Sequence, residues 1–110
     1  MKILKYGDLK EHGHDVYEFC YQYDEKNPVH WNKDSLYLDS DDLVVLEPYI
    51  DKVFENFHYF GPQRIEISEW EKIKILYFEQ EKKDMEVFIE IDNWIGQSPI
   101  GKTFFWILGI

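Results

Sequence analysis

The sequence predicts one small α+β domain, with two or three helices packed on a mixed or antiparallel sheet. Three observations favour this class: one segment alternates like a strand, two carry apolar residues at helical spacing, and the last residues form an apolar run. The 110 residues leave room for one hydrophobic core, so we expect a single domain over 1–110. Hydrophobic residues make up 45% of the chain and aromatic residues 18%, which excludes a disordered chain.

The clearest strand covers residues 15–23. Its side chains alternate between two faces, with Tyr17 and Phe19 on one face and Glu18 and Cys20 on the other. This alternation predicts a half-buried antiparallel strand. Turn residues bound it on both sides: 11–14 separate it from a short strand within 1–6, and 24–28 form the turn that follows.

The clearest helix covers residues 39–57. Ser40 is a suitable N-cap, and Asp41 and Asp42 place negative charge in the first turn, where the helix dipole favours it. Pro48 leaves two interpretations, of which we favour the first: it kinks this helix, or the helix begins there. The buried stripe is expected to consist of Leu43, Leu46, Ile50, Val53, Phe54 and Phe57.

A second helix is predicted from Ser68, which forms a capping box with Glu71. Its buried face would contain Trp70, Ile73, Leu76 and Tyr77, at steps of three and four residues.

Two interpretations of residues 84–95 stay open, a strand and a helix. From Met85 to Ile91 every second residue is apolar, as in a strand, but apolar residues also recur at helical spacing. We favour the helix, because Gly96 would end it naturally. Residues 103–110 are apolar on both faces and predict an interior strand.

Residues 96–103 match the G-x-x-x-x-G-K-T pattern of a phosphate-binding loop. That loop requires a strand before it and a helix after it, so that the helix N-terminus holds the phosphates. Here strand-forming residues follow the pattern, and Pro99 removes one backbone N–H donor. We therefore expect a helix-to-strand turn with no nucleotide or other cofactor.

Metal binding is weakly indicated. His12, His14 and Asp15 could supply ligands to zinc or nickel, with His30 and His58 as further donors. Two histidines in a flexible turn without a paired thiolate are usually solvated, so we expect no metal. The aspartates near the start of the 39–57 helix lack the ligand spacing of a calcium loop.

The chain shows no catalytic signature, and we expect a protein that is not an enzyme. Cys20 lies in the middle of a strand, where a buried and unreactive thiol is expected. A single cysteine also excludes an internal disulfide and fits a reducing compartment, so we expect a cytoplasmic protein. No apolar run is long enough to span a membrane.

The charge pattern favours a basic protein partner. The chain carries 22 acidic and 12 basic residues, a net charge of −10, which disfavours nucleic acid and anionic membranes. Between residues 34 and 57 there are seven acids and one base. A solvated helix face would explain this pattern, but a docking surface would also do so. The candidate binding residues are Asp39, Asp41, Asp42, Glu47, Asp51, Glu55, Tyr49 and Tyr59.

Aromatic side chains beside turns and acids could anchor such a partner, because tyrosine and tryptophan dominate interface hot spots. Those expected to be partly exposed are Tyr17, Tyr21, Tyr23, Trp31, Tyr37, Tyr49 and Tyr59.

Three segments resemble small immunity proteins of bacterial polymorphic-toxin systems, including contact-dependent growth inhibition. They are Tyr59-Phe60-Gly61 after an amphipathic helix, Trp70 followed by Lys72-Ile73-Lys74, and the closing run Phe104–Ile110. The resemblance covers about the last two-thirds of the chain and implies an acidic, cytoplasmic α+β protein. It further implies that the protein binds and neutralises one cognate toxin domain, often a nuclease. It transfers no individual functional residues.

Two functions therefore stay open. The first is a stoichiometric toxin inhibitor that associates with a basic toxin domain. The second is a structural or regulatory interaction module without catalysis, which could be a homodimer.

Overall fold

Five strands form one antiparallel sheet in the computed structural model, which describes residues 1–109. The strands are β1 (Ile3–Leu4), β2 (Val16–Cys20), β3 (Leu36–Asp39), β4 (Pro62–Glu66) and β5 (Phe104–Leu108). Their order across the sheet is β1-β3-β2-β5-β4. The helices are α1 (Leu9–His12), α2 (Ser40–Val53), α3 (Ile67–Gln80) and α4 (Met85–Gly96), and one 3-10 turn, η1 (Tyr6–Asp8), precedes α1. The predicted α+β class is confirmed.

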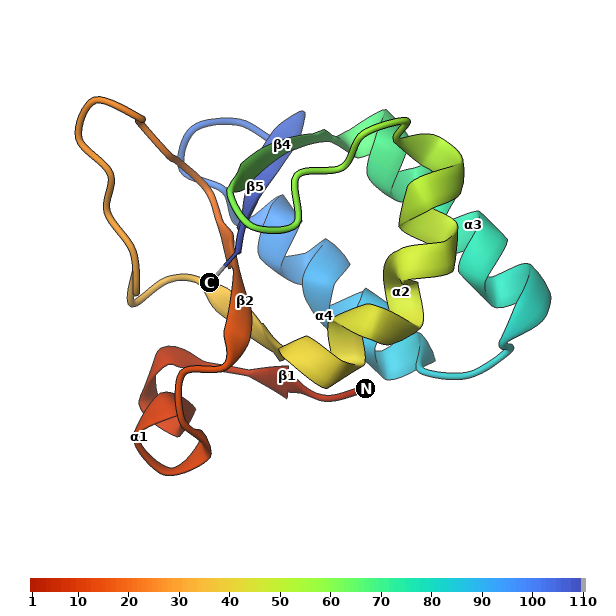
Figure 1. The fold of residues 1–110 in the computed structure, drawn as a ribbon, viewed down its shortest axis with the longest axis horizontal. Coiled ribbons are helices and arrows are strands. Elements are labelled where there is room, and N and C mark those ends of the chain that lie inside the picture. The colour runs from red at the N-terminus through yellow and green to blue at the C-terminus, as the bar shows by residue number, and fades with distance from the viewer. Residues whose placement is uncertain (110) are drawn as a thin grey trace.

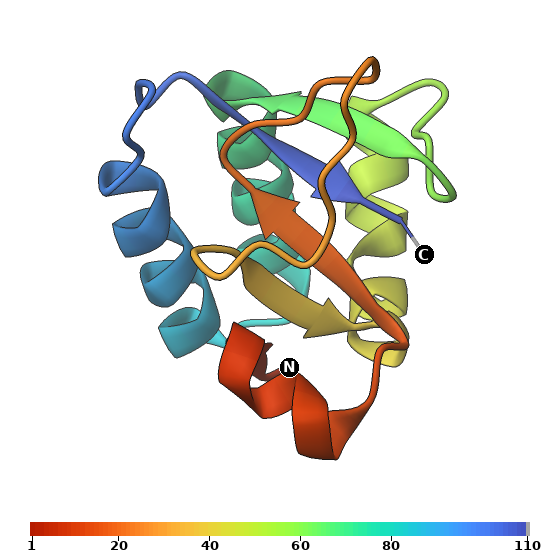
Figure 2. The ribbon, with the colours of Figure 1, turned by 90° about the vertical axis from the view of Figure 1, so that its left-hand side faces the viewer.

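Helices α2, α3 and α4 all pack on the same face of the sheet (Figures 1 and 2). The centre of this core is aromatic, with the indole of Trp70 between the rings of Phe19, Phe88 and Phe105 at centroid distances of 5.6 to 6.2 Å. Burying rings of this size contributes a large share of the stability of so small a domain.

The opposite face of the sheet is covered only in part. Leu4, Leu9, Val16 and Tyr37 form a second buried cluster beneath α1. The long loop between β2 and β3 crosses the same face, as Figure 2 shows. The antiparallel strand predicted within 15–23 is confirmed as β2, but its predicted half-burial is wrong, because this second layer also buries Val16, Glu18 and Cys20 on the other face.

Helix α2 runs without interruption through Pro48, so the alternative of a helix beginning at Pro48 is wrong. The N-cap is Asp39 rather than Ser40, and its Oδ1 accepts the N–H of Asp41 at 2.8 Å. The helix ends at Val53, four residues before the predicted end, because the backbone of Phe54 is extended.

Helix α3 begins at Ile67, one residue before the predicted N-cap. Strand β4 leads directly into it, and Glu66 and Glu69 form the capping box that was expected from Ser68 and Glu71. The N–H of Glu66 donates to Oε1 of Glu69 at 2.8 Å. The predicted buried face is confirmed for Trp70, Ile73 and Tyr77, whereas Leu76 is half-buried.

Residues 85–96 are helical, so the favoured interpretation is confirmed and the strand alternative is wrong. Strand β5 lies between β2 and β4, as predicted for an interior strand. The segment 97–103 joins helix α4 to strand β5, which is the reverse of the order in a phosphate-binding loop. Residue 110 of the predicted strand lies outside the described residues.

Candidate partner-binding surface

One cluster brings acidic and tyrosine side chains together from β2, α2 and the loop after α2. We call it the acidic face; its members are Asp15, Tyr17, Glu47, Asp51 and Tyr59. The hydroxyl of Tyr59 donates to Oδ1 of Asp51 at 2.7 Å. The negative charge of Glu47 contributes to the raised pKa of both Tyr17 and Tyr59, so this carboxylate lies within electrostatic range of both phenols.

Both phenols of the acidic face remain protonated at neutral pH. Burial is the largest cause that raises the pKa of Tyr17, followed by the charges of Glu47 and Asp15. Burial also raises the pKa of Tyr59, followed by its hydrogen bond to Asp51. The acidic face therefore offers neutral aromatic groups surrounded by negative charge, a combination that attracts cations and gives them a surface to pack on.

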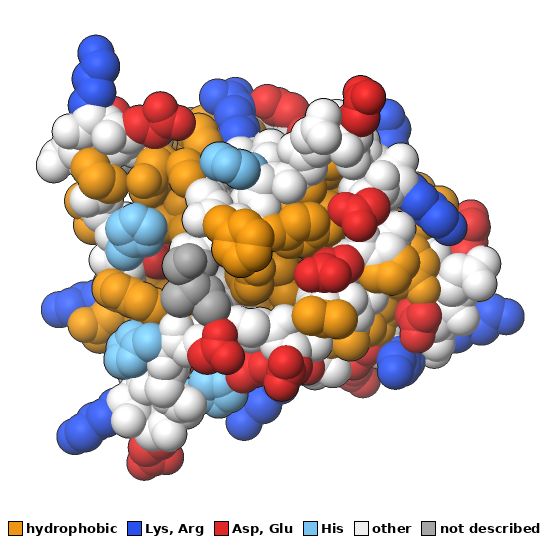
Figure 3. Space-filling view, viewed as in Figure 1, with side chains coloured by type: hydrophobic (Ala, Val, Ile, Leu, Met, Phe, Trp, Pro, Cys, Tyr) orange, Lys and Arg blue, Asp and Glu red, His pale blue; other side chains and the backbone are white. Residues whose placement is uncertain are grey.

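Exposed apolar side chains lie beside this cluster in the sequence. Phe60 follows Tyr59 directly and is 88% exposed, and Val44 on α2 is 54% exposed. Figure 3 shows acidic side chains interspersed with apolar surface on this side of the molecule. An aromatic side chain this exposed gains little from the fold itself, and it is well suited to bury itself against a partner.

The acids at the N-terminal end of α2 have structural roles. Asp39 caps the helix and also pairs with His12, at 2.7 Å between Nε2 and Oδ2. Oδ2 of Asp42 accepts the backbone N–H of Lys2 at 3.2 Å. These contacts tie the N-terminal segment to α2. Asp41 is exposed beside them, and Glu55 is exposed beyond the other end of the helix.

Tyr49, one of the two predicted tyrosine anchors, is buried. Its side chain is 6% exposed, its hydroxyl donates to Glu81, and its ring packs edge-on against Tyr77. It therefore fastens α2 to α3 and is closed to a partner. The expected exposure is also wrong for Tyr21 and Tyr37. It is confirmed for Tyr17, Tyr23, Trp31 and Tyr59.

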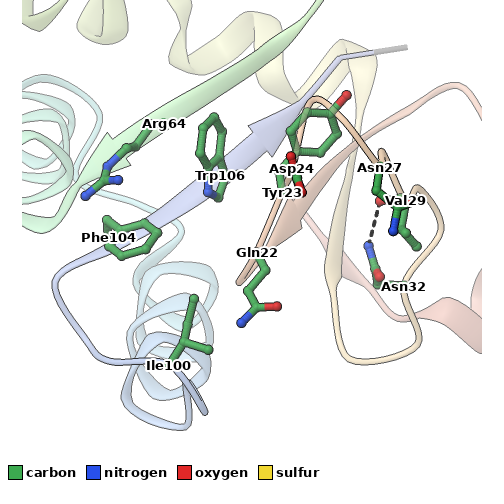
Figure 4. Close-up of a pocket in the computed structure, with 10 residues that line it drawn as sticks. All are labelled: Gln22, Tyr23, Asp24, Asn27, Val29, Asn32, Arg64, Ile100, Phe104 and Trp106. Atoms are coloured by element: carbon green, nitrogen blue, oxygen red, sulfur yellow. Dashed lines mark hydrogen bonds between the residues drawn. The ribbon is translucent and has the colours of Figure 1, made fainter.

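A second feature, which the sequence did not reveal, is a hollow of about 550 Å³ on the open face of the sheet, the face opposite α2, α3 and α4 (Figure 4). Phe104 and Trp106 on β5 form its floor beside Arg64 on β4. The loop between β2 and β3 forms the opposite wall. The sequence predicted a strand buried on both faces, because its residues are apolar throughout. That prediction is wrong for Phe104 and Trp106, which are half-buried and line the hollow.

Glu18 organises the loop beside this hollow. Its carboxylate is 3% exposed and accepts the N–H groups of Trp31 and Asn32 at 2.7 and 3.0 Å. It also accepts the hydroxyl of Ser35 at 2.6 Å and the side-chain amide of Asn32 at 2.8 Å. A buried carboxylate with this many donors is satisfied, so it fixes the loop to the sheet.

The candidate metal ligands do not converge. His12 pairs with Asp39, whereas the ring of His14 packs edge-on against Trp31 at 4.7 Å. Within residues 1–109, no three histidine, cysteine or acidic side chains are grouped so that they could hold a metal ion. The thiol of Cys20 is buried, and its burial raises its pKa, which agrees with the expected unreactive thiol.

No helix over residues 1–109 is both long and apolar enough to cross a membrane. Comparisons with models of protein families, with curated proteins and with solved structures find no match to this chain.

Proposed function

We propose that this protein is a stoichiometric protein inhibitor that binds a basic toxin domain through the acidic face. The observation that carries this proposal is the placement of Tyr17 and Tyr59 among the carboxylates of Asp15, Glu47 and Asp51, next to the exposed Phe60. The resemblance to immunity proteins supplies the class of partner. A reducing cytoplasm, the proposed compartment, suits the free buried thiol of Cys20.

The two parts of this surface would do different work. Carboxylates at the surface and a net charge of −10 would steer a basic partner and raise the association rate at low salt. Partly buried tyrosines and an exposed phenylalanine would exclude water after docking and slow dissociation. Fast capture suits an inhibitor of a catalytic toxin, because each turnover of free toxin does damage.

The capture experiment uses tagged protein in extracts of the native host, at low and high salt. We expect one basic partner in a one-to-one complex, weakened but retained at high salt. The doubly reversed variant Glu47→Lys/Asp51→Lys should capture much less of it. The matched control Glu79→Lys/Glu86→Lys changes net charge equally at exposed positions on α3 and α4. Equal loss in both variants would argue against the acidic face.

Toxin inhibition is tested by growth. Cells that express the captured partner should grow normally when they also express the wild-type protein, and poorly with Glu47→Lys/Asp51→Lys. Growth that does not depend on the protein would contradict the inhibitor function, even if the complex forms.

A further inference from the structure

The hollow on the open face has a floor that is anchored in the core. Phe104 and Trp106 point into the hollow, and they alternate along β5 with Phe105 and Ile107, which are 1% and 2% exposed in the core beneath the helices. Because the inward side chains fix the strand, the outward rings keep their positions.

The wall of the hollow is also held in place. The loop between β2 and β3 is fastened at its base by the four hydrogen bonds to Glu18. At its other end, Tyr23 packs against Trp106 at 5.7 Å between ring centroids and against His30 at the same distance. The volume of the hollow, about 550 Å³, lies within the usual range for ligand pockets.

The chemistry of the lining suits a cation. The faces of aromatic rings attract positive charge, and Arg64 already uses one of them: its guanidinium carbon lies 3.9 Å from the centroid of the Phe104 ring. Nε of Arg64 is paired with Glu66 at 2.9 Å, so its charge is offset locally. Trp106 and Tyr23 present further rings, and Asp24 adds a carboxylate to the lining.

We propose that this hollow is a second contact site, which takes an arginine or lysine side chain from the basic partner. The cation would stack on Trp106 and Tyr23, as Arg64 does on Phe104. The amide side chains of Gln22 and Asn27 would hydrogen-bond the partner's backbone on either side of that residue. The inference rests on the proposed function for the nature of the partner, and on this lining for the site.

The test needs no toxin, because a capped Gly-Arg-Gly peptide serves as the probe. It is titrated into the ¹⁵N-labelled protein, together with a capped Gly-norleucine-Gly peptide of similar length but no charge. We expect the arginine peptide alone to shift the indole Nε1–H of Trp106 and the backbone N–H groups of 22–32, saturating at concentrations on the order of millimolar. Equal shifts with both peptides, or shifts confined to the acidic face, would overturn the proposal.

Two variants secure the assignment. Trp106→Leu and Tyr23→Leu should each weaken binding of the arginine peptide by roughly tenfold. Tyr6→Leu changes an exposed aromatic residue outside both the hollow and the acidic face, and it should leave the binding of the peptide unchanged. Because the two substitutions lie on different elements, local unfolding in one variant would not explain weaker binding in both. The capture experiment depends on Glu47 and Asp51 and the peptide titration on the hollow, so the two results are independent. Absence of peptide binding would contradict the hollow but not the proposed function. Absence of a captured partner would contradict the proposed function but not the peptide result.

Discussion

Gly109 lies against the loop that carries the tyrosine and phenylalanine of the candidate surface. A Cβ at this position would lie 2.3 Å from the carbonyl oxygen of Tyr59 and 2.9 Å from the carbonyl carbon of Phe60. The N–H of Gly109 also donates to the carbonyl of Gly61 at 3.2 Å. A residue without a side chain is therefore needed here, because the neighbours are backbone atoms that cannot turn aside.

We expect Gly109→Ala to destabilise the protein by roughly 1–3 kcal/mol, because the 59–60 backbone must shift to admit the methyl group. Gly96→Ala is the matched control, since a Cβ there meets no atom within 4 Å. That control should be neutral or slightly stabilising, as alanine favours the helix. Urea denaturation measures both. Equal stability of the two variants would contradict the close packing.

A second effect of a single residue is the contribution of Asp39 to stability at low pH. The N–H of Asp41 and the side chain of His12 both hydrogen-bond Asp39 and hold the pKa of its carboxyl below the ordinary range. A carboxyl whose pKa is lower in the folded state stabilises the protein above its unfolded pKa. This contribution is lost as the pH falls through the folded value.

Asp39→Asn should therefore lower stability at neutral pH, and should make the loss of stability below about pH 4 shallower than in the wild type. Asparagine still caps the helix, so this change removes mainly the charge. Denaturation midpoints from pH 7 to 2 would show it, with Asp41→Asn as the control. If the stability of Asp39→Asn falls with pH as steeply as that of the wild type, this role for Asp39 is contradicted.

At the scale of the element, α2 tolerates a proline that interrupts its hydrogen bonding. Pro48 has no N–H to donate to the carbonyl four residues earlier, and yet the helix extends for five more residues. The buried side chains of Leu43, Leu46, Tyr49 and Ile50 on both sides of it hold the two halves against the sheet and α3. Tertiary packing thus overrides a strong local preference.

Pro48→Ala should stabilise the protein by about 1–3 kcal/mol, since alanine restores the missing hydrogen bond and Pro48 is exposed. Val44→Ala, at another exposed position of the same helix, separates this effect from general helix propensity. Thermal unfolding would measure both. Destabilisation by Pro48→Ala would indicate that the proline shapes how α2 fits the sheet.

The loop between β2 and β3 is the other element whose geometry depends on one group. The carboxylate of Glu18 accepts four hydrogen bonds from this loop. Glu18→Gln removes its charge and replaces one acceptor oxygen with an NH₂ group, which can only donate. We expect faster hydrogen exchange at the N–H groups of Trp31 and Asn32, with little change in β5. Glu25→Gln, exposed on the same loop, should change neither. Unchanged protection in Glu18→Gln would contradict the anchoring role.

At the scale of the whole molecule, sequence periodicity predicted the class of fold, the three long helices and the interior position of the last strand. It placed the helix ends less well. The N-caps are Asp39 and Glu66, the last residues of the preceding strands, and not the nearby serines that the sequence favoured. It also missed the burial of Tyr49, which depends on packing between α2 and α3. Acidic composition identified α2, but only the fold shows that Asp51 accepts a hydrogen bond from Tyr59 and that the charge of Glu47 reaches Tyr17 and Tyr59. Asp39 and Asp42 instead bind His12 and the backbone of Lys2.

The central claim is that the acidic face, and not net charge alone, directs capture of a basic partner. The most direct measurement is the association rate constant with the captured partner across a range of ionic strength, for the wild type and two charge-reversed variants. We predict that Glu47→Lys/Asp51→Lys lowers the rate by roughly tenfold or more at low salt, and that the difference shrinks as salt rises. Glu79→Lys/Glu86→Lys should lower it far less. Equal losses in the two variants, or rates that do not respond to either, would contradict the account.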